Sequence, residues 1–194
     1  MALRDVSPIR IPVRAPRRTV ARTTAGVTVG GPPVLAVPFV RQTQNQWCWA
    51  ACSQMVAAYL GNPNVKQCEL ANFLHEQTNC CVKPSSSKCN QPSPVEGINS
   101  VYRHLEIDNV SEELPTALAV VFRELQAGRP IEVGYQWFGG GGHVAIIYGA
   151  TANGMLLIHD PWYGSGVEPY IRLRAAYGMG RWTFSFGLFK KAGE

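Results

Sequence analysis

The chain has 194 residues, of which 46% are hydrophobic and 16% are charged, a composition typical of one globular domain. No apolar run approaches the roughly 20 residues of a membrane-spanning helix. The N-terminus also lacks the apolar core of a classical signal peptide. These features predict no membrane association and no Sec-type export signal in this sequence.

The net charge of +5 arises in the first 33 residues. They hold six of the 18 lysines and arginines and one of the 13 acidic residues, so the remainder carries 12 of each sign. This Arg-rich segment has few large apolar residues, and we expect residues 1–33 to be a disordered leader or linker. It has no aromatic side chain for base stacking, so nucleic-acid binding is not favoured. Residues 34–194 are expected to form the single folded domain.

Residues 34–40 begin that domain with a short apolar run, which Pro38 interrupts and which suits an edge strand. Helices are then expected over 49–60, 68–77, 93–106 and 116–128. The third starts with Ser93 and Pro94, and Glu96 completes the pattern of a capping box. Strand-like runs separated by Gly and Asn turns follow at 130–137, 143–150, 154–160, 169–174 and 181–189. Helices first and strands second indicate an α+β fold, with a helical half packed on an antiparallel sheet.

Cys48 stands between two tryptophans at the start of the first expected helix, in the stretch QTQNQWCWAAC. A cysteine attacks as its thiolate, and the unsatisfied N–H groups at a helix N-terminus favour an anion. The alternative is a packing role, because cysteine is a small hydrophobe and tryptophan fills cores. A nucleophilic role also requires a histidine that can reach Cys48.

His143 is the best candidate for that histidine. It opens a strand directly after FGGGG, where glycines leave room for a substrate backbone. Asp160 ends the next strand, and in an antiparallel hairpin the start of one strand lies beside the end of the next. The hairpin therefore brings His143 and Asp160 to one edge of the sheet, where the carboxylate can orient the imidazole. His159 should point to the opposite face, and His75 and His104 are expected to be solvated helix residues.

The candidate residues, in chain order, resemble the active site of a papain-like cysteine protease: Gln42, Cys48-Trp49-Ala50, His143 and Asp160-Pro161-Trp162. The motif QxQxxWCWAA and the use of Asp rather than Asn are similar to the bacterial avirulence-protease branch, whose members are delivered as effectors into other cells. The resemblance implies that Cys48 is the nucleophile, His143 the base and Asp160 its orienting partner. It also implies that Gln42, six residues before Cys48, supplies the side-chain donor of the oxyanion hole.

The resemblance further implies a papain-like fold and a cysteine endopeptidase that cleaves protein substrates without a cofactor or a metal. We expect a monomer that is secreted or delivered into a target cell, with an activating or immunity protein as a further partner. The expected borders of the substrate cleft are Trp47, Trp49, Gly141, Gly142 and Trp162. Two alternatives stay open: amide transfer or deamidation by the same residues, and a catalytically silent fold used for binding.

Five cysteines remain besides Cys48. Cys52 lies one helical turn later, and a packing role is expected for it. The other four flank a polar loop with few apolar side chains: Cys68, Cys80, Cys81 and Cys89. Disulfides are favoured over a zinc site because Cys-x-x-Cys spacing is absent. All three pairings are open, and a bridge between the adjacent Cys80 and Cys81 is the least favoured because it strains the backbone. Such bridges imply that the protein meets an oxidising compartment.

Overall fold

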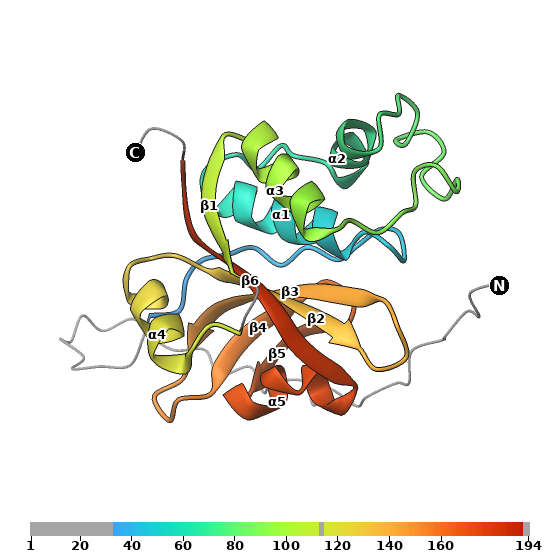
Figure 1. The fold of residues 1–194 in the computed structure, drawn as a ribbon. Coiled ribbons are helices and arrows are strands. Elements are labelled where there is room, and N and C mark those ends of the chain that lie inside the picture. The colour runs from blue at the N-terminus through green and yellow to red at the C-terminus, as the bar shows by residue number, and fades with distance from the viewer. Residues whose placement is uncertain (1–32, 113–114, 192–194) are drawn as a thin grey trace.

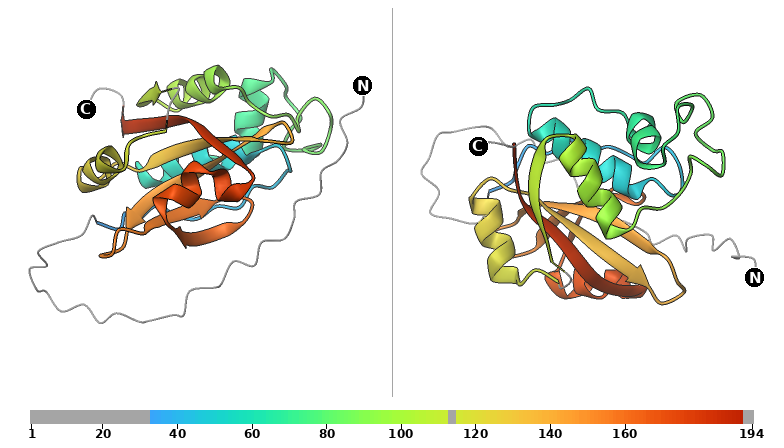
Figure 2. Two further views of the ribbon diagram at one scale, coloured as in Figure 1. Left: turned by 60° about the horizontal axis from the view of Figure 1, so that its bottom comes forward. Right: turned by 45° about the horizontal axis from the view of Figure 1, so that its top comes forward.

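The computed structural model describes residues 33–112 and 115–191, which form an α+β fold. The expected leader, residues 1–33, lies outside the described residues except for Pro33, as do residues 192–194 of the expected domain. Three helices lie over one face of an antiparallel sheet, and Figure 1 shows this helical half above the strands. Two further views show the same two layers (Figure 2). In the described part of the chain, no helix has the length and apolar character needed to cross a membrane.

The five α-helices and the short 3-10 helix of the described residues are α1 (Cys48–Tyr59), α2 (Gln67–Leu74), α3 (Val95–His104), α4 (Leu118–Gln126), α5 (Tyr170–Arg174) and η1 (Ala176–Gly178). The six strands are β1 (Ile107–Glu112), β2 (Ile131–Trp137), β3 (Gly142–Ala150), β4 (Leu156–Asp160), β5 (Gly164–Glu168) and β6 (Gly180–Lys191). They lie side by side in the order β1-β6-β2-β3-β4-β5.

A separate hydrophobic core lies on each face of the sheet. The core under α1, α2 and α3 includes Met55 and Ile98 from the helices and Ile146 and Phe186 from the strands. The core on the other face joins α4 and α5 to the same strands. This arrangement follows from the period of two in β2 and β3, where successive side chains point to opposite faces. Helix α1, which begins at Cys48, therefore packs on one face of the strands that carry His143 and Asp160.

Most of the expected elements are confirmed. The four helices of the first half form within a few residues of their expected ends, and α1 stops where Gly61 adopts a φ of +95°. The hairpin of β3 and β4 also forms, with Ile146 opposite His159 and Thr151 N–H donating to Met155 O at 2.8 Å across the turn. The expected strands over 130–137 and 181–189 correspond to β2 and β6.

Three expectations about local structure are wrong. Residues 34–40 form no strand, and Leu35 N–H makes one ladder-like bond to Tyr148 O at 2.8 Å. Residues 169–174 form helix α5, because Pro169 takes the N-cap position and Arg172 pairs with Glu168 one turn earlier at 3.0 Å. The capping box does not form, since Pro94 is the N-cap of α3 and contributes no side-chain hydrogen bond. Strands β1 and β5 were not expected, because neither shows clear alternation of apolar and polar residues.

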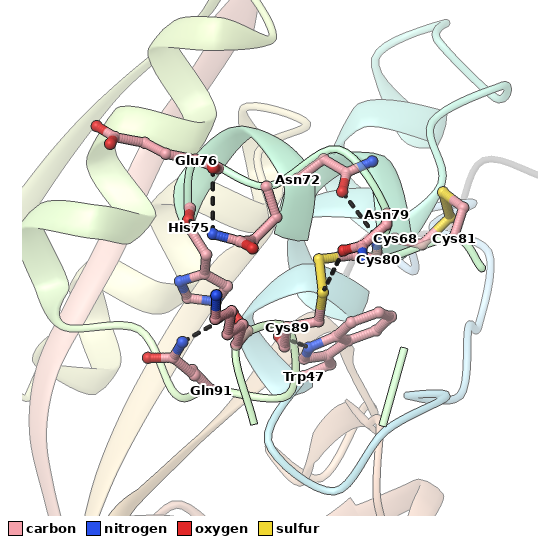
Figure 3. Close-up of a disulfide and its surroundings, with 12 residues drawn as sticks. Trp47, Cys68, Asn72, His75, Glu76, Asn79, Cys80, Cys81, Cys89 and Gln91 are labelled. Carbon is pink, nitrogen blue, oxygen red and sulfur yellow. Dashed lines mark hydrogen bonds between the residues drawn. A yellow bond between two sulfur atoms is a disulfide. The ribbon is translucent and has the colours of Figure 1, made fainter. Parts of the chain in front are cut away.

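Two disulfides close the polar loop between α2 and α3, Cys68–Cys81 and Cys80–Cys89. Both appear in Figure 3, where the second lies beside Trp47. Cys80 and Cys89 are fully buried in the first core, so the bridge supplies apolar surface that the loop itself lacks. Cys48 and Cys52 are the free thiols of the described residues.

Candidate active site

Cys48 is the first residue of α1 and is partly exposed, whereas the next residues of the helix are buried. Trp47 is the N-cap residue, and no side chain caps the helix start. The first N–H groups of a helix have no partner within the helix, so those near Cys48 are available to an anion. The rest of α1 is rich in alanine and apolar residues, which anchors this terminus firmly in the core.

His143 and Asp160 meet as the hairpin predicts. His143 Nε2 lies 2.8 Å from Asp160 Oδ1, and the two residues are 8% and 2% exposed. The backbone N–H groups of Trp162 and Tyr163 donate to the same carboxylate oxygen at 2.9 and 3.0 Å. Burial alone would raise the pKa of Asp160, but His143 and these two N–H groups lower it below its ordinary value. These protein donors replace water around the buried Asp160 carboxylate and favour its ionised form.

The imidazole of His143 is held in its charged form. Burial opposes that charge, but Asp160 and a hydrogen bond with the Cys48 side chain outweigh it, and the pKa of His143 is raised to about 10. Because Nε2 faces Asp160, the other ring nitrogen, Nδ1, is left for the thiol. His143 is therefore held on a buried carboxylate through one ring nitrogen, and its pKa responds to Cys48 at the start of α1.

Four aromatic rings lie around His143, and the sequence did not indicate them as a group. Trp137 stacks near His143 with ring centroids 5.8 Å apart, and Tyr163 meets the imidazole edge-on at 6.2 Å. Tyr135 and Tyr177 contact each other at 5.5 Å beneath the histidine. Such rings exclude water and lower the local dielectric, which strengthens the contact between His143 and Asp160. The clustering of Trp and Tyr in the second half of the chain was the available signal.

Gln42 is buried beside the turn that follows Asp160. Its backbone N–H donates to Pro161 O at 3.1 Å, and its side-chain Nε2 donates to Gln44 O at 2.8 Å. An amide nitrogen carries two hydrogens, so the second remains for another acceptor. Its Oε1 is buried and has no hydrogen-bond partner among the described residues.

Gln67, at the start of α2, clamps the segment that carries Gln42 and was missed from the sequence. Its Oε1 accepts from Thr43 N–H at 2.9 Å, and its Nε2 donates to Arg41 O at 2.9 Å. The buried amide thus fixes the backbone on both sides of Gln42. A lone glutamine at a helix start gives no sequence signal for this role.

An open groove of about 590 Å³ runs past Gln42 and Trp162. A role for Trp162 in the substrate cleft stays a prediction. Trp47 and Trp49 do not border this groove: each is 1% exposed, and they pack in the core under α1. The expectation that these two tryptophans line the cleft is therefore wrong, because the helix turns both rings inward. The remaining lining residues of the groove are Arg41, Thr43, Gln44, Asn45, Asn90 and Pro161.

The two expected cleft glycines differ from each other. A Cβ at Gly141 would meet nothing within 4 Å, and its φ of +80° belongs to the left-handed region, so this position is open and needs glycine for its conformation. A Cβ at Gly142 would lie 2.9 Å from Tyr135 O, so glycine is needed there for strand pairing. Gly142 therefore serves the hairpin, and only Gly141 faces open space.

Residues 34–172 match the sequence profile of a family described as the papain-like cysteine protease AvrRpt2. The match covers well over half of the chain. The chain belongs to this family of papain-like cysteine proteases. It is accordingly a cysteine peptidase, and the resemblance noted in the sequence is confirmed. Among curated proteins, none matches the chain.

Solved structures support the papain-like fold. The peptidase domain of Streptococcus ComA, a bifunctional ABC transporter, superposes with a TM-score of 0.59 at 17% identity, over 80% of this chain and 98% of that chain. A double-glycine-motif protease from an AMS/PCAT transporter, solved with a leader peptide, gives a TM-score of 0.51 at 16% identity, over 85% of this chain and 96% of that chain. At such identities the likeness shows the fold alone.

In this papain-like protease, residues 89–91 form a segment that we call the strap. The strap is hydrogen-bonded to the start of α1. Trp47 Nε1 donates to Cys89 O at 2.8 Å, and Trp49 Nε1 donates to Gln91 O at 3.1 Å (Figure 3 shows the first bond). Both indole N–H groups are satisfied in this way, which allows the rings to be buried. The two tryptophans that flank Cys48 thus join the start of α1 to the disulfide loop.

Asn90, in the middle of the strap, faces the groove. Its Oδ1 accepts from Gln46 N–H at 3.2 Å, and its Nδ2 donates to Asn45 Oδ1 at 2.6 Å. The strap is therefore both a groove wall and a support for the turn that leads into Cys48.

The other histidines take no part in this site. His159 points to the opposite face of β4, as expected, where Nε2 contacts Val37 O at 3.0 Å and the ring stacks on Tyr148 at 3.8 Å. His75 and His104 are not merely solvated: His75 packs edge-on against Trp49, and His104 stacks on Phe73 at 3.9 Å. In the part of the chain that the structure describes, no group of three or more His, Cys, Asp or Glu side chains could hold a metal ion.

Proposed function

We propose that the protein is a cysteine endopeptidase that cleaves protein substrates through Cys48, His143 and Asp160. The proposal depends most on one observation, the 2.8 Å contact between His143 Nε2 and Asp160 Oδ1, which leaves the other ring nitrogen for the Cys48 side chain. A cysteine, a base within reach and a third group that orients the base are the parts of an activated nucleophile.

The reaction begins when the Cys48 thiolate attacks the carbonyl carbon of the scissile amide. The resulting oxyanion is stabilised by the free side-chain N–H of Gln42 and the backbone N–H of Cys48 at the start of α1. The His143 imidazolium then gives its proton to the leaving amine, which leaves an acyl-enzyme at Cys48. His143 then takes a proton from water, the resulting hydroxide attacks the thioester, and the C–S bond breaks. This releases the acyl group as a carboxylic acid and restores the Cys48 thiolate beside the His143 imidazolium. Asp160 keeps the imidazole oriented throughout.

We further propose that the protein acts as a bacterial effector on a protein of a target cell, with an activating or immunity partner. The family match and the motif QxQxxWCWAA support this role. The two disulfides favour passage through an oxidising compartment before the substrate is met.

Thiol labelling tests the nucleophile first. With limiting iodoacetamide at about pH 6, where an ordinary cysteine is almost wholly protonated, Cys48 should be alkylated rapidly. Cys52 is the matched control, because it is fully buried and burial together with Glu132 raises its pKa. Peptide mapping that finds Cys52 modified before Cys48 would contradict the assignment.

Cleavage is tested by mapping new protein N-termini in target cells that express either the parent protein or Cys48→Ala. Endopeptidase activity predicts N-termini that depend on Cys48 and on His143. Conversion of Gln or Asn side chains to acids, without new N-termini, would instead identify a deamidase that uses the same residues.

A further inference from the structure

The two carboxylate oxygens of Asp160 have different surroundings. Oδ1 faces His143 and the backbone N–H groups of the following turn. Oδ2 accepts a hydrogen bond from the hydroxyl of Tyr177 at 3.0 Å. A buried carboxylate requires donors at both oxygens, because an unmade bond leaves the desolvation cost of the charge uncompensated. The hydroxyl of Tyr177 meets this requirement at Oδ2.

Tyr177 reaches Asp160 from an unusual backbone conformation. Ala176 and Tyr177 have φ angles of +43° and +59°, in the left-handed region that side chains other than glycine rarely adopt. Gly178 follows with a φ of +91°, so three successive residues are left-handed. Such residues cost free energy and persist where the surrounding structure holds them. Here the left-handed turn precedes β6 and directs a tyrosine from outside the hairpin back toward Asp160.

The Tyr177 hydroxyl is held in the form that donates. Burial, Asp160 and Tyr135 together raise the pKa of Tyr177 well above its ordinary value, so the hydroxyl keeps its proton over the working pH range. Its ring is fixed by edge-on contacts with Tyr135 and Tyr163, with centroids 5.5 and 6.0 Å apart. The donor is therefore pre-oriented toward Oδ2.

We propose that Tyr177 is a positioning residue of the active site, whose hydroxyl keeps the Asp160 carboxylate ionised and aligned on His143. The inference rests on the proposed function, in which His143 activates Cys48. Without the donor at Oδ2, Asp160 holds a proton up to a higher pH, and the imidazolium then lacks its counter-charge. The thiolate at Cys48 loses its partner in turn, so fewer molecules carry the reactive ion pair at acidic pH.

Other groups near Asp160 do not replace Tyr177. The Tyr135 hydroxyl and the Cys52 thiol are buried nearby, and both keep their protons because burial raises their pKa values. Tyr163 contributes its backbone N–H to Oδ1. Glu168 lines the small cavity behind Asp160, where Arg172 pairs with it at 3.0 Å. Within the described residues, Tyr177 is the hydrogen-bond donor to Oδ2.

The test is the pH dependence of iodoacetamide alkylation at Cys48 in the full chain, which needs no knowledge of the substrate. Tyr177→Phe should slow alkylation about tenfold at about pH 4.5 and leave it unchanged above about pH 7, because one lost hydrogen bond to a charged group raises the pKa of Asp160 by about one to two units. Tyr170→Phe is the matched control, because its hydroxyl donates to Thr116 O at 3.1 Å away from the active site. This control should keep the parental pH profile.

An Asp160→Asn background separates positioning from packing. There the charge that Tyr177 stabilises is absent, so adding Tyr177→Phe should change the alkylation profile no further. Replacing Tyr177 with 3,5-difluorotyrosine keeps the ring and strengthens the donor, and it should shift the acidic limb toward lower pH. This second replacement keeps the test valid even if Tyr177→Phe unfolds.

The outcomes are distinct. A parental profile in Tyr177→Phe, an equal slowing at every pH, or the same shift in the Asp160→Asn background would each overturn the inference while leaving Cys48 as the nucleophile. A parent protein in which Cys48 is not alkylated selectively would overturn the proposed function, and the inference with it.

Discussion

Among the described residues three carboxyl groups are buried, and in two of them, Asp160 and Glu132, the pKa is shifted in opposite directions. Asp160, at the end of β4, receives hydrogen bonds from His143, from two backbone N–H groups and from Tyr177, and its pKa is lowered. Glu132, in β2 between the helical half and the sheet, is 0% exposed, and its recorded donor is the hydroxyl of Tyr102. Burial raises the pKa of Glu132 to about 8, against the effect of that bond.

The difference shows that burial alone does not set the charge of a carboxyl group. A carboxylate offers several acceptor positions, and its ionised form is stable in the interior only when donors fill them. Those of Asp160 are filled, whereas Oε1 of Glu132 has no hydrogen-bond partner within the described residues. Asp160 can therefore support a positive charge on His143, while Glu132 is a neutral hydrogen-bonding group of the core at pH 7.

The largest loss of activity is expected from Gln42→Ala, which leaves both carboxyl groups unchanged. Gln42→Ala removes a neutral donor and should lower peptide turnover by about 10²–10³-fold, the usual loss for one oxyanion-hole donor. The pH profile of turnover should keep its shape, because no carboxyl group changes its charge. A thermal melt checks the fold, and a variant that is unfolded would indicate a structural role for Gln42.

Converting each acid to its amide tests directly whether Asp160 is charged and Glu132 is neutral. Asp160→Asn keeps the shape but removes the charge that supports imidazolium, and we expect turnover to fall by about 10- to 100-fold at pH 7. Glu132→Gln replaces a group that is already neutral, so turnover should stay within about twofold of the parent. Equal losses in the two variants would refute the assigned charge states.

The pH dependence of stability sharpens the comparison further. The pKa of Glu132 is raised on folding from 4.5 to about 8, so its stabilising contribution is complete below pH 4.5 and is lost as the pH rises toward 8. The unfolding free energy should therefore fall by about 1.4 kcal/mol per pH unit from this group. Urea unfolding between about pH 5 and pH 6.5 avoids the contribution of His143, which begins to be lost only above 6.5. His75 and His159, whose pKa values burial lowers, add a slope of opposite sign in this window, so the Glu132 contribution is taken from a difference between variants.

Glu132→Gln is the control for that slope. The amide does not titrate, so between about pH 5 and pH 6.5 the slopes of the variant and the parent should differ by about 1.4 kcal/mol per pH unit, while the decline that His143 causes above this range stays. Persistence of the full slope in this variant would assign it to other groups.

The sequence predicted the parts of the site that depend on local spacing. Cys48 at a helix start and the hairpin that joins His143 to Asp160 follow from patterns within a few residues or across one turn. Gln67 and the strap could not be predicted in this way, because each makes its side-chain contacts across a longer stretch of chain. Tyr177 is as near to Asp160 in sequence as His143 is, but it reaches the carboxylate from a left-handed turn that no strand pairing predicts.

The errors have a similar origin. Trp47 and Trp49 were expected in the cleft because they flank Cys48, but the rotation of α1 and the carbonyl acceptors of the strap decide their direction. For residues 169–174, alternation suggested a strand, whereas the Pro169 N-cap and one ion pair to Glu168 decide for a helix. Tertiary partners outweighed local patterns in both cases.

If peptide substrates bind in the groove, the strap links the redox state of the Cys80–Cys89 disulfide to the binding of peptide. Cys89 ends the bridge to Cys80, and the next residue, Asn90, is a wall of the groove, so opening the bridge loosens a surface that a bound peptide would touch. This linkage is reciprocal. A peptide that binds more tightly when the disulfide is intact protects the disulfide from a reductant, and reduction of the disulfide lowers the affinity of the groove for the peptide. A protein that passes from an oxidising to a reducing environment would thus hold its bridge longest when its groove is filled.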